Sequence, residues 1–301
     1  MGGFITDFSL NRKFRKYFKK KIKSVIIEYE NQKEVVKPKK DYNVFFPVES
    51  EEDTYLIKKT KEDLKVCEQG LPIPPVELRM HYGNDDEVYL NAKGQIDTML
   101  RILGESGSTL QEMSRVLDFG CGSGRMIRWL KPFAESCEIW GTDISSEHIY
   151  WANTYLNPPF NFATTTTIPH LPFEDKYFNL IYAGSVFTHI DDLAIAWLLE
   201  LRRILAEDGM AYITIHDRHS IELLNRIPIW KKSWVTKSVN ENTLYQKYKD
   251  EFGVFTIFRG PESQVFYDID YFCNSIRNIF EVISITPEAY GYQTGVLLKK
   301  K

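Results

Sequence analysis

One short stretch constrains the fold of this chain more than any other, the run VLDFGCGSGR over Val116–Arg125. An apolar segment ends in Asp118 and continues directly into glycines at alternate positions, Gly120, Gly122 and Gly124. Helix-forming residues follow at once. A strand, a glycine turn and a helix in this order allow a ligand to lie against bare backbone at a helix N-terminus. The pattern therefore predicts an α/β protein with a ligand site at this turn.

The spacing of the glycines distinguishes between two kinds of nucleotide ligand. The dinucleotide fingerprint has the spacing G-x-G-x-x-G, and its turn holds a pyrophosphate. Here the spacing is G-x-G-x-G, and Asp118 lies two residues before the first glycine. A carboxylate at this position repels a diphosphate but suits a ligand that carries an ammonium group. We therefore predict that S-adenosylmethionine is the ligand and that its ammonium group lies near Asp118.

A second acidic residue, Asp143, ends the next apolar segment, 25 residues after Asp118. A carboxylate at this place can accept hydrogen bonds from both ribose hydroxyls. Ile144 is then expected to pack on the adenine, although simple core packing is an alternative for an isoleucine.

The composition is that of a globular protein, with 301 residues of which 43% are hydrophobic and 26% charged. No apolar run approaches the roughly 18 residues of a membrane-spanning helix. The N-terminus lacks the apolar segment of a secretory signal. The four cysteines form no C-x-x-C pair. These features favour a cytoplasmic, reducing environment.

The net charge of −3 conceals a basic segment, because residues 12–23 contain eight lysines and arginines and no acid. The remaining chain is acidic, which argues against nucleic acid as a partner. Apolar residues recur at helical spacing through the same region, at Phe14, Phe18, Ile22, Val25, Ile26 and Tyr29. A basic amphipathic helix over residues 12–29 predicts peripheral contact with the inner face of a membrane. Docking of the same apolar face on the body of the protein or on a second subunit is the alternative, and the oligomeric state stays open.

From Arg115 onward, expected strands and helices alternate, which is typical of a parallel sheet covered by helices. Strands are predicted near 115–119, 138–143, 161–165, 178–183 and 211–216, with helices near 124–131, 145–156 and 191–205. A helix near 269–279 leads to strands at 280–286 and 292–299, which a short turn forces to pair antiparallel. The predicted fold is a Rossmann-like, doubly wound, seven-stranded and mostly parallel sheet with an antiparallel last strand.

Three regions are expected along the chain. Residues 1–40 form a basic amphipathic helix and a linker. Residues 41–110 form a helical lead-in and a cap on the substrate side, with helices near 55–68 and 88–103. Residues 111–301 form the core, with a lid-like insertion at 217–265 that follows the carboxyl end of a strand, where open α/β sheets bind ligands. The aromatic residues of this insertion favour stacking on a sugar or an aromatic substrate, or else a small separate hydrophobic core.

Several motifs in this order resemble the class I S-adenosylmethionine-dependent methyltransferases over about residues 75–301. They are the glycine motif and the segments Trp140–Ser145, Leu171–Tyr182 and Leu201–Leu205. Three shorter segments, Pro74–Arg79, Gly184–His189 and Gly291–Gln293, resemble a bacterial subgroup often associated with glycosyltransferases and polysaccharide biosynthesis. Two departures are Asn179 in place of the usual aspartate before strand four, and Thr164–Thr167 in place of a Gly-Asp-Ala that contacts the adenine in many members. The resemblance therefore implies an adenine contact near this segment, with Thr167, Ile168 and Leu171 as the candidates. The resemblance implies transfer of a methyl group to a small-molecule or glycan acceptor.

The residues after strands four and five are expected to face the acceptor. Ser185 should border the methionine part and the transferred methyl group. A hydroxyl acceptor benefits from a general base, and His189 and His216 follow these two strands. The alternative for His189 is a structural role at a helix start. No metal is expected, because the spacing of the nearby histidines and aspartates matches no metal-binding signature.

The leading function is O-methylation of a sugar hydroxyl in a glycan or glycolipid. Two alternatives stay open. One is N- or C-methylation in natural-product assembly. The other is a non-catalytic partner protein that keeps the methyltransferase fold.

Overall fold

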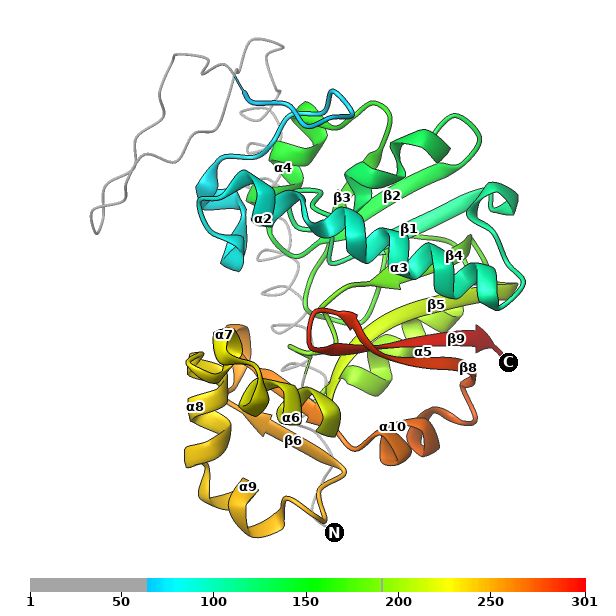
Figure 1. Cartoon of the computed structure of the whole chain (residues 1–301). Coiled ribbons are helices and arrows are strands. Elements are labelled where there is room, and N and C mark those ends of the chain that lie inside the picture. Colours follow the sequence, from blue (N-terminus) through cyan, green and yellow to red (C-terminus); the bar gives the residue numbers. More distant parts are fainter. Residues whose placement is uncertain (1–63, 191) are drawn as a thin grey trace, which may run out of the picture. The chain divides into compact units, whose positions relative to one another are not determined.

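A single sheet of nine strands organises the structure, a computed structural model that describes residues 64–190 and 192–301 (Figure 1). The predicted helix over residues 12–29 and most of that over 55–68 lie outside the described residues. Within them, residues 64–68 are not helical, and Val66 instead bridges to Pro72. None of the helices in the described ranges is long and apolar enough to cross a bilayer.

Five parallel strands form the part of the sheet that positions the glycine turn. They are β1 (Arg115–Phe119), β2 (Glu138–Asp143), β3 (Asn161–Thr164), β4 (Phe178–Ala183) and β5 (Leu205–Asp217). Their order is β3-β2-β1-β4-β5, and every neighbouring pair is parallel. The order reverses between β1 and β4, and open α/β sheets bind their ligands at such a reversal. The predicted Rossmann-like topology is confirmed.

The last two strands close the sheet in the predicted antiparallel manner. β9 (Gln293–Lys300) pairs with β5 and with β8 (Phe280–Tyr290), both antiparallel. The prediction of seven strands was short by two, because the insertion adds β6 (Val254–Ile257) and β7 (Gln264–Tyr267). These two strands join the sheet because β5 is long and continues past its pairing with β9. Its last residues, His216 and Asp217, pair instead with β7.

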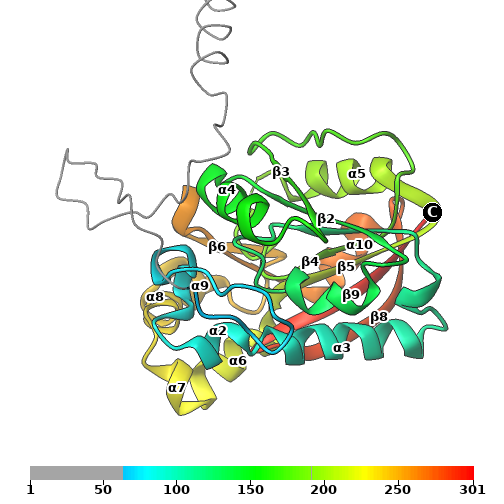
Figure 2. The same cartoon turned by 90° about the horizontal axis from the view of Figure 1, so that it is seen from above.

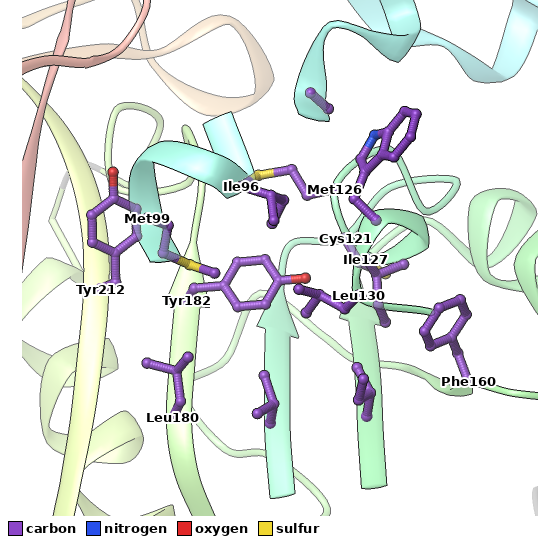
Figure 3. Packing of buried hydrophobic residues seen from close by; sticks show 14 of the residues in the cluster. Ile96, Met99, Cys121, Met126, Ile127, Leu130, Phe160, Leu180, Tyr182 and Tyr212 are labelled. Atoms are coloured by element: carbon purple, nitrogen blue, oxygen red, sulfur yellow. The ribbon is translucent and has the colours of Figure 1, made fainter. Parts of the chain in front are cut away.

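Helices cover both faces of the sheet. α3 (Ala92–Glu105) and α4 (Ser146–Tyr155) pack on one face, and α5 (Ala194–Ile204) and α10 (Ile269–Ile276) on the other. Figure 2 shows α3 and α5 on opposite sides of the strands. On the α3 face, the ring of Tyr182 from β4 lies among Ile96, Met99, Met126 and Leu130 (Figure 3). This packing holds the end of β4 against the segment that follows the glycine turn.

The helix predicted over 124–131 was wrong in type. The segment is a 3₁₀ helix, η4 (Ile127–Phe133). Pro132 has no N–H, and its ring clashes with a carbonyl four residues earlier in an α-helix. In addition, the Arg128 Nε donates to the Gly124 carbonyl at 2.9 Å. This hydrogen bond occupies a backbone acceptor that an α-helix starting at the turn would use.

The start predicted for the helix at 191–205 was also too early. α5 begins at Ala194 with Leu193 as its N-cap. Asp192 is not the cap, and its Oδ2 pairs with the Arg259 guanidinium at 2.6 Å. The aspartate therefore connects this part of the core to the insertion.

The insertion folds into four short helices and the β6–β7 pair at the carboxyl end of β5 (Figure 1). The helices are α6 (Arg218–Arg226), α7 (Pro228–Lys231), α8 (Trp234–Glu241) and α9 (Thr243–Tyr248). Residues of α6, α8, β6 and β7 form an apolar cluster made of Ile221, Leu224, Val235, Val239, Ile257 and Phe266, against which Trp230 of α7 and Tyr245 of α9 pack. The insertion also contains the short η5 (Gly260–Glu262), and the short elements outside the insertion are α2 (Asp86–Leu90), η1 (Val76–Leu78), η2 (Met80–Tyr82) and η3 (Leu110–Glu112).

Candidate functional site

The glycine turn after β1 has a left-handed backbone at each of its three glycines, with φ of +80° at Gly120, +52° at Gly122 and +78° at Gly124. A Cβ added at Gly120 would lie 2.4 Å from the Val186 Cγ2, and one at Gly124 would lie 2.4 Å from Leu156 Cδ1. At Gly122 the nearest atom is 3.6 Å away. Two of the glycines are therefore needed for close packing, whereas the middle one faces more open space.

Asp118 lies beside this turn as a buried carboxyl group, only 2% exposed. Its Oδ2 has no hydrogen-bond partner among the described residues. Burial raises the pKa of Asp118 to about 8. The Tyr182 hydroxyl interacts with the carboxyl and opposes this rise, although no hydrogen bond of normal geometry joins them. A buried acid without a full set of partners fits a cationic group that comes with the ligand.

Asp143 is held by two backbone donors at the end of β2. The Gly122 N–H donates to its Oδ2 and the Ser145 N–H to its Oδ1, both at 2.8 Å. Each carboxylate oxygen keeps a further lone pair for a ligand hydroxyl. The same residue thus connects the glycine turn to the neighbouring strand end.

Apolar side chains stand exposed at the ends of β2 and β3. Ile144 is 60% exposed and Ile168 is 68% exposed. The Thr165 N–H donates to the Asp143 carbonyl at 2.8 Å, which ties the two strand ends together. Thr167 is exposed in the same segment. Exposed isoleucines beside a fixed carboxylate fit a flat apolar ligand group next to a ribose.

Arg125 forms a cluster that sequence reasoning missed. Its Nη1 donates to Gln95 Oε1 at 2.6 Å and to the Tyr290 hydroxyl at 2.9 Å, and its guanidinium lies 3.7 Å from the Tyr82 ring centre. The hydroxyls of Tyr82 and Tyr290 are 2.8 Å apart. A Cβ at Gly184 would lie 2.9 Å from the Tyr290 ring, so the cluster reaches the end of β4. Its members are far apart in sequence, and no local pattern marks them.

The segment before α3 closes over the glycine turn. The Ser123 hydroxyl donates to the Leu78 carbonyl at 2.5 Å, and the Tyr89 hydroxyl lies 3.1 Å from Ser123 Oγ. The Met80 sulfur is the nearest atom to a Cβ placed on Gly122. Leu78, Met80 and Tyr89 of this segment therefore pack against the glycine turn.

His189 is half-buried and has its ring fixed by the insertion. Its Nδ1 lies 2.8 Å from the Ser263 carbonyl and 3.3 Å from Gln264 Nε2. The Ser263 carbonyl is the nearer of the two and can only accept, so in the neutral ring Nδ1 carries the proton and Nε2 does not, and the Gln264 amide nitrogen lies beside Nδ1 without donating to it. Ser185, four residues earlier in the loop after β4, has a left-handed φ of +60°.

His216 has a different environment, with 1% exposure. Its ring stacks on Phe266 at 4.9 Å and on Tyr292 at 5.2 Å between ring centres. Burial lowers its pKa to about 3, and the neighbouring His189 contributes to the same shift. Asp217 is not its partner, because that carboxyl caps α6 through Ser220 and accepts from Thr294.

Among the described residues, no three His, Cys, Asp or Glu side chains converge in a way that could hold a metal ion. His219 Nε2 lies 3.0 Å from Glu288 Oε1. Asp191, which the sequence placed near the histidines, lies outside the described residues.

A hollow of about 450 Å³ lies apart from this site, lined by Trp140, Ala163, Pro172, Phe173, Glu174 and Tyr177. Its aromatic residues belong to the cluster on the α5 face, whereas Tyr182 belongs to the cluster on the α3 face. The hollow is therefore distinct from the glycine turn.

Three solved structures show what the chain is similar to. The PH0226 protein from Pyrococcus horikoshii OT3 is 20% identical with a TM-score of 0.51, over 72% of this chain and 93% of that one. An S-adenosylmethionine-dependent methyltransferase from Clostridium acetobutylicum ATCC 824 is 14% identical with a TM-score of 0.49, over 69% and 92%. The 1,6-didemethyltoxoflavin-N1-methyltransferase from Burkholderia thailandensis, which holds 1,6-didemethyltoxoflavin and S-adenosylhomocysteine, is 13% identical with a TM-score of 0.46, over 71% and 81%. The first likeness supports a common fold.

The family is shown by a model of the methyltransferase domain that matches residues 92–251, which is more than half of the chain. The match spans the glycine turn, Asp118, Asp143, both histidines and most of the insertion. With the parallel sheet and its antiparallel last strand, this match identifies both the enzyme class and its methyl donor, S-adenosylmethionine. The chain belongs to the class I S-adenosylmethionine-dependent methyltransferases.

Proposed function

We propose that the glycine turn and the adjoining strand ends hold S-adenosylmethionine. Asp118 balances the ammonium group, since its buried Oδ2 has no other partner in the described part of the chain. Asp143, fixed by two backbone donors, accepts from the ribose hydroxyls. The remaining contacts are assigned to Gly120, Gly122 and Gly124 for close approach of the backbone, to Ile144, Thr167 and Ile168 for the adenine, and to Ser185 for the methionine part. When bound, the cofactor supplies a methyl group on a sulfonium, which a nucleophile attacks in line.

We propose that the acceptor atom is a hydroxyl oxygen and that His189 takes its proton. The observation that carries this proposal is the 2.8 Å contact between His189 Nδ1 and the Ser263 carbonyl, which orients the ring and places the proton of the neutral imidazole on Nδ1. A general base works best when its pKa lies near the working pH. His216 is poorly matched to that role because burial lowers its pKa to about 3. We therefore assign His216 to ring stacking and His189 to proton transfer.

The proposed acceptor class is a sugar of a glycan or glycolipid. Its first support is the resemblance of three short segments to polysaccharide-associated methyltransferases. Its second is the insertion, where Trp234 and Phe258 are each about half exposed and meet edge to face at 5.6 Å between ring centres. Exposed rings can cover the apolar face of a substrate while its polar groups stay hydrated. In this proposal the insertion at 217–265 is a lid, and residues before 110 are a cap on the same side.

Methyl transfer from labelled S-adenosylmethionine to cell-envelope glycans tests the proposal, with the methylated atom located by mass spectrometry and NMR. The expected product is a methyl ether. His189→Ala should lower kcat by about 10² to 10⁴-fold, the usual contribution of general acid–base catalysis. His219→Ala, a histidine that lies 3.0 Å from Glu288, is the matched control and should retain activity. Methyl transfer only to nitrogen or carbon of non-sugar acceptors would refute the acceptor class.

A further inference from the structure

Polar side chains from three parts of the fold form a hydrogen-bonded ring behind the end of β4, closed by Ser185, Thr214 and Gln293, with Thr188 attached to it. The Ser185 N–H donates to Thr214 Oγ1 at 2.7 Å, and Thr214 Oγ1 lies 2.7 Å from Gln293 Oε1. Gln293 Nε2 lies 2.8 Å from Ser185 Oγ, which is 3.1 Å from Thr188 Oγ1. Thr188 Oγ1 also lies 3.0 Å from the Ser185 carbonyl. The ring joins β5, β9 and the loop after β4.

Two backbone groups of Ser185 fix the direction of every hydrogen bond in the ring, because its N–H can only donate and its carbonyl can only accept. The N–H of Ser185 can only donate, so Thr214 accepts it and gives its own proton to Gln293 Oε1. The amide nitrogen of Gln293 must then face Ser185 Oγ and donate to it. Thr188 gives its proton to the Ser185 carbonyl, so the Ser185 hydroxyl proton points to Thr188. The Ser185 oxygen is left with one lone pair and no proton for any further partner.

The ring also holds a conformation that a serine seldom adopts. Ser185 has a φ of +60°, in the left-handed region that is unfavourable for a residue other than glycine. Residues with such a backbone conformation persist where several neighbouring contacts hold it in place, and they cluster at functional sites. Thr188 and Thr214 are fully buried and Gln293 is nearly so, whereas Ser185 itself is only half-buried. The buried residues of the ring thus hold one partly accessible oxygen, Ser185 Oγ, in place.

The loop that carries this oxygen packs against the glycine turn. The side chain of the next residue, Val186, packs against Gly120, so the loop after β4 and the turn after β1 are in contact. Asp118 and Tyr182 are register partners on the two strands that lead into them. A group held between these strand ends meets Asp118 from one strand and Ser185 from the other.

We propose that Gln293 is a positioning residue for the cofactor, which acts by holding Ser185 Oγ as a hydrogen-bond acceptor for the ammonium group of the methionine part. The proposal rests on the proposed placement of Ser185 beside that part. An ammonium group has three N–H donors, and a hydroxyl whose proton is already committed can only accept from it. Gln293 lies at the start of β9, so the C-terminal hairpin is required for cofactor binding as well as for closing the sheet.

The test compares two ligands by calorimetry, S-adenosylhomocysteine and its analogue in which hydrogen replaces the α-amino group. The wild-type chain should prefer S-adenosylhomocysteine. In Gln293→Met this preference should fall about tenfold, while affinity for the deamino analogue stays within about twofold. Ser185→Ala should show the same loss, and the double variant should show no further loss, because both changes remove one interaction.

Thr294→Val is the matched control, since Thr294 is the next residue on β9 and its buried hydroxyl donates to Asp217 Oδ2 at 2.7 Å. It should keep the full preference for S-adenosylhomocysteine. An unchanged preference in Gln293→Met, or an equal loss in Thr294→Val, overturns the proposal. If Gln293→Met shows no thermal unfolding transition, Ser185→Ala decides alone by the same criterion. Failure of the wild-type chain to bind either ligand overturns the proposed cofactor site itself, a result distinguishable from binding without a change in preference.

Discussion

Alanine at Gly122 and alanine at Gly120 should separate cofactor binding from folding, because the two glycines have different surroundings. At Gly120 a Cβ would lie 2.4 Å from the Val186 side chain. At Gly122 the nearest atoms would be the Met80 sulfur at 3.6 Å and His148 Nδ1 at 3.9 Å, which is ordinary contact. Alanine therefore fits at Gly122 in the free protein but clashes at Gly120.

The expected losses of stability follow from these distances and from the backbone conformation of the two glycines. A left-handed φ costs alanine about 1–2 kcal/mol, which applies at both positions. For a domain of this size that corresponds to a fall in Tm of about 2–8 °C. At Gly120 the clash adds about 1–3 kcal/mol of overpacking. Removing two methyl groups in Gly120→Ala/Val186→Ala should recover most of this second part.

Thermal unfolding and calorimetry with S-adenosylhomocysteine measure the two effects. Gly122→Ala should unfold only a few degrees below the wild type but bind at least tenfold more weakly, because its methyl group occupies the place where the ligand approaches the backbone. Equal affinity of Gly122→Ala and the wild type would refute the assignment of this turn as the cofactor cradle. A Gly120→Ala protein as stable as Gly122→Ala would refute the packing argument.

Three further predictions concern charge. Burial raises the pKa of Asp118 to about 8, so between about pH 4 and pH 8 the folded state holds a proton that the unfolded state has released. The free energy of unfolding of the cofactor-free protein should therefore fall as pH rises through this window, and Asp118→Asn should remove the slope; an unchanged slope contradicts the assignment. The contribution of His216 to the pH dependence of stability has the opposite sign, because its pKa of about 3 lies below the ordinary 6.5. The free energy of unfolding should therefore fall as pH falls from about 6.5 to 3. His216→Phe should remove that loss while the chain stays folded. Finally, the full chain should sediment with anionic liposomes at low salt and be released by high salt, whereas equal sedimentation after deletion of residues 1–30 would exclude the membrane contact predicted for residues 12–29.

The parallel part of the sheet could be predicted closely because its signals are local. β1 and β2 have the predicted bounds, since each is a short apolar run that ends in an aspartate and a turn. The two departures come from interactions beyond the local pattern. Pro132 and Arg128 favour the 3₁₀ helix η4 over the expected α-helix, and the end of the long β5 pairs with β7 of the insertion.

The candidate site likewise contains some residues that local sequence signals reveal and others that only tertiary contacts reveal. Asp118 and Asp143 were visible because each ends a strand beside a glycine turn or a capping serine. Arg125, Tyr290 and Gln293 were not assigned a role, because their partners lie up to 208 residues away along the chain. His216 could be found as a strand-end histidine, but the rings that bury it come from β7 and the C-terminal hairpin. Burial, which decides whether such a histidine can act as a base, depends on these tertiary contacts.

A crystal structure of the chain with S-adenosylhomocysteine tests the central claim most directly. We predict that the ribose hydroxyls lie within hydrogen-bonding distance of Asp143, that the ligand backs onto Gly122, and that the ammonium group lies between Asp118 and Ser185. Binding elsewhere, such as in the hollow lined by Trp140 and Phe173, with no contact to the glycine turn, would contradict the account.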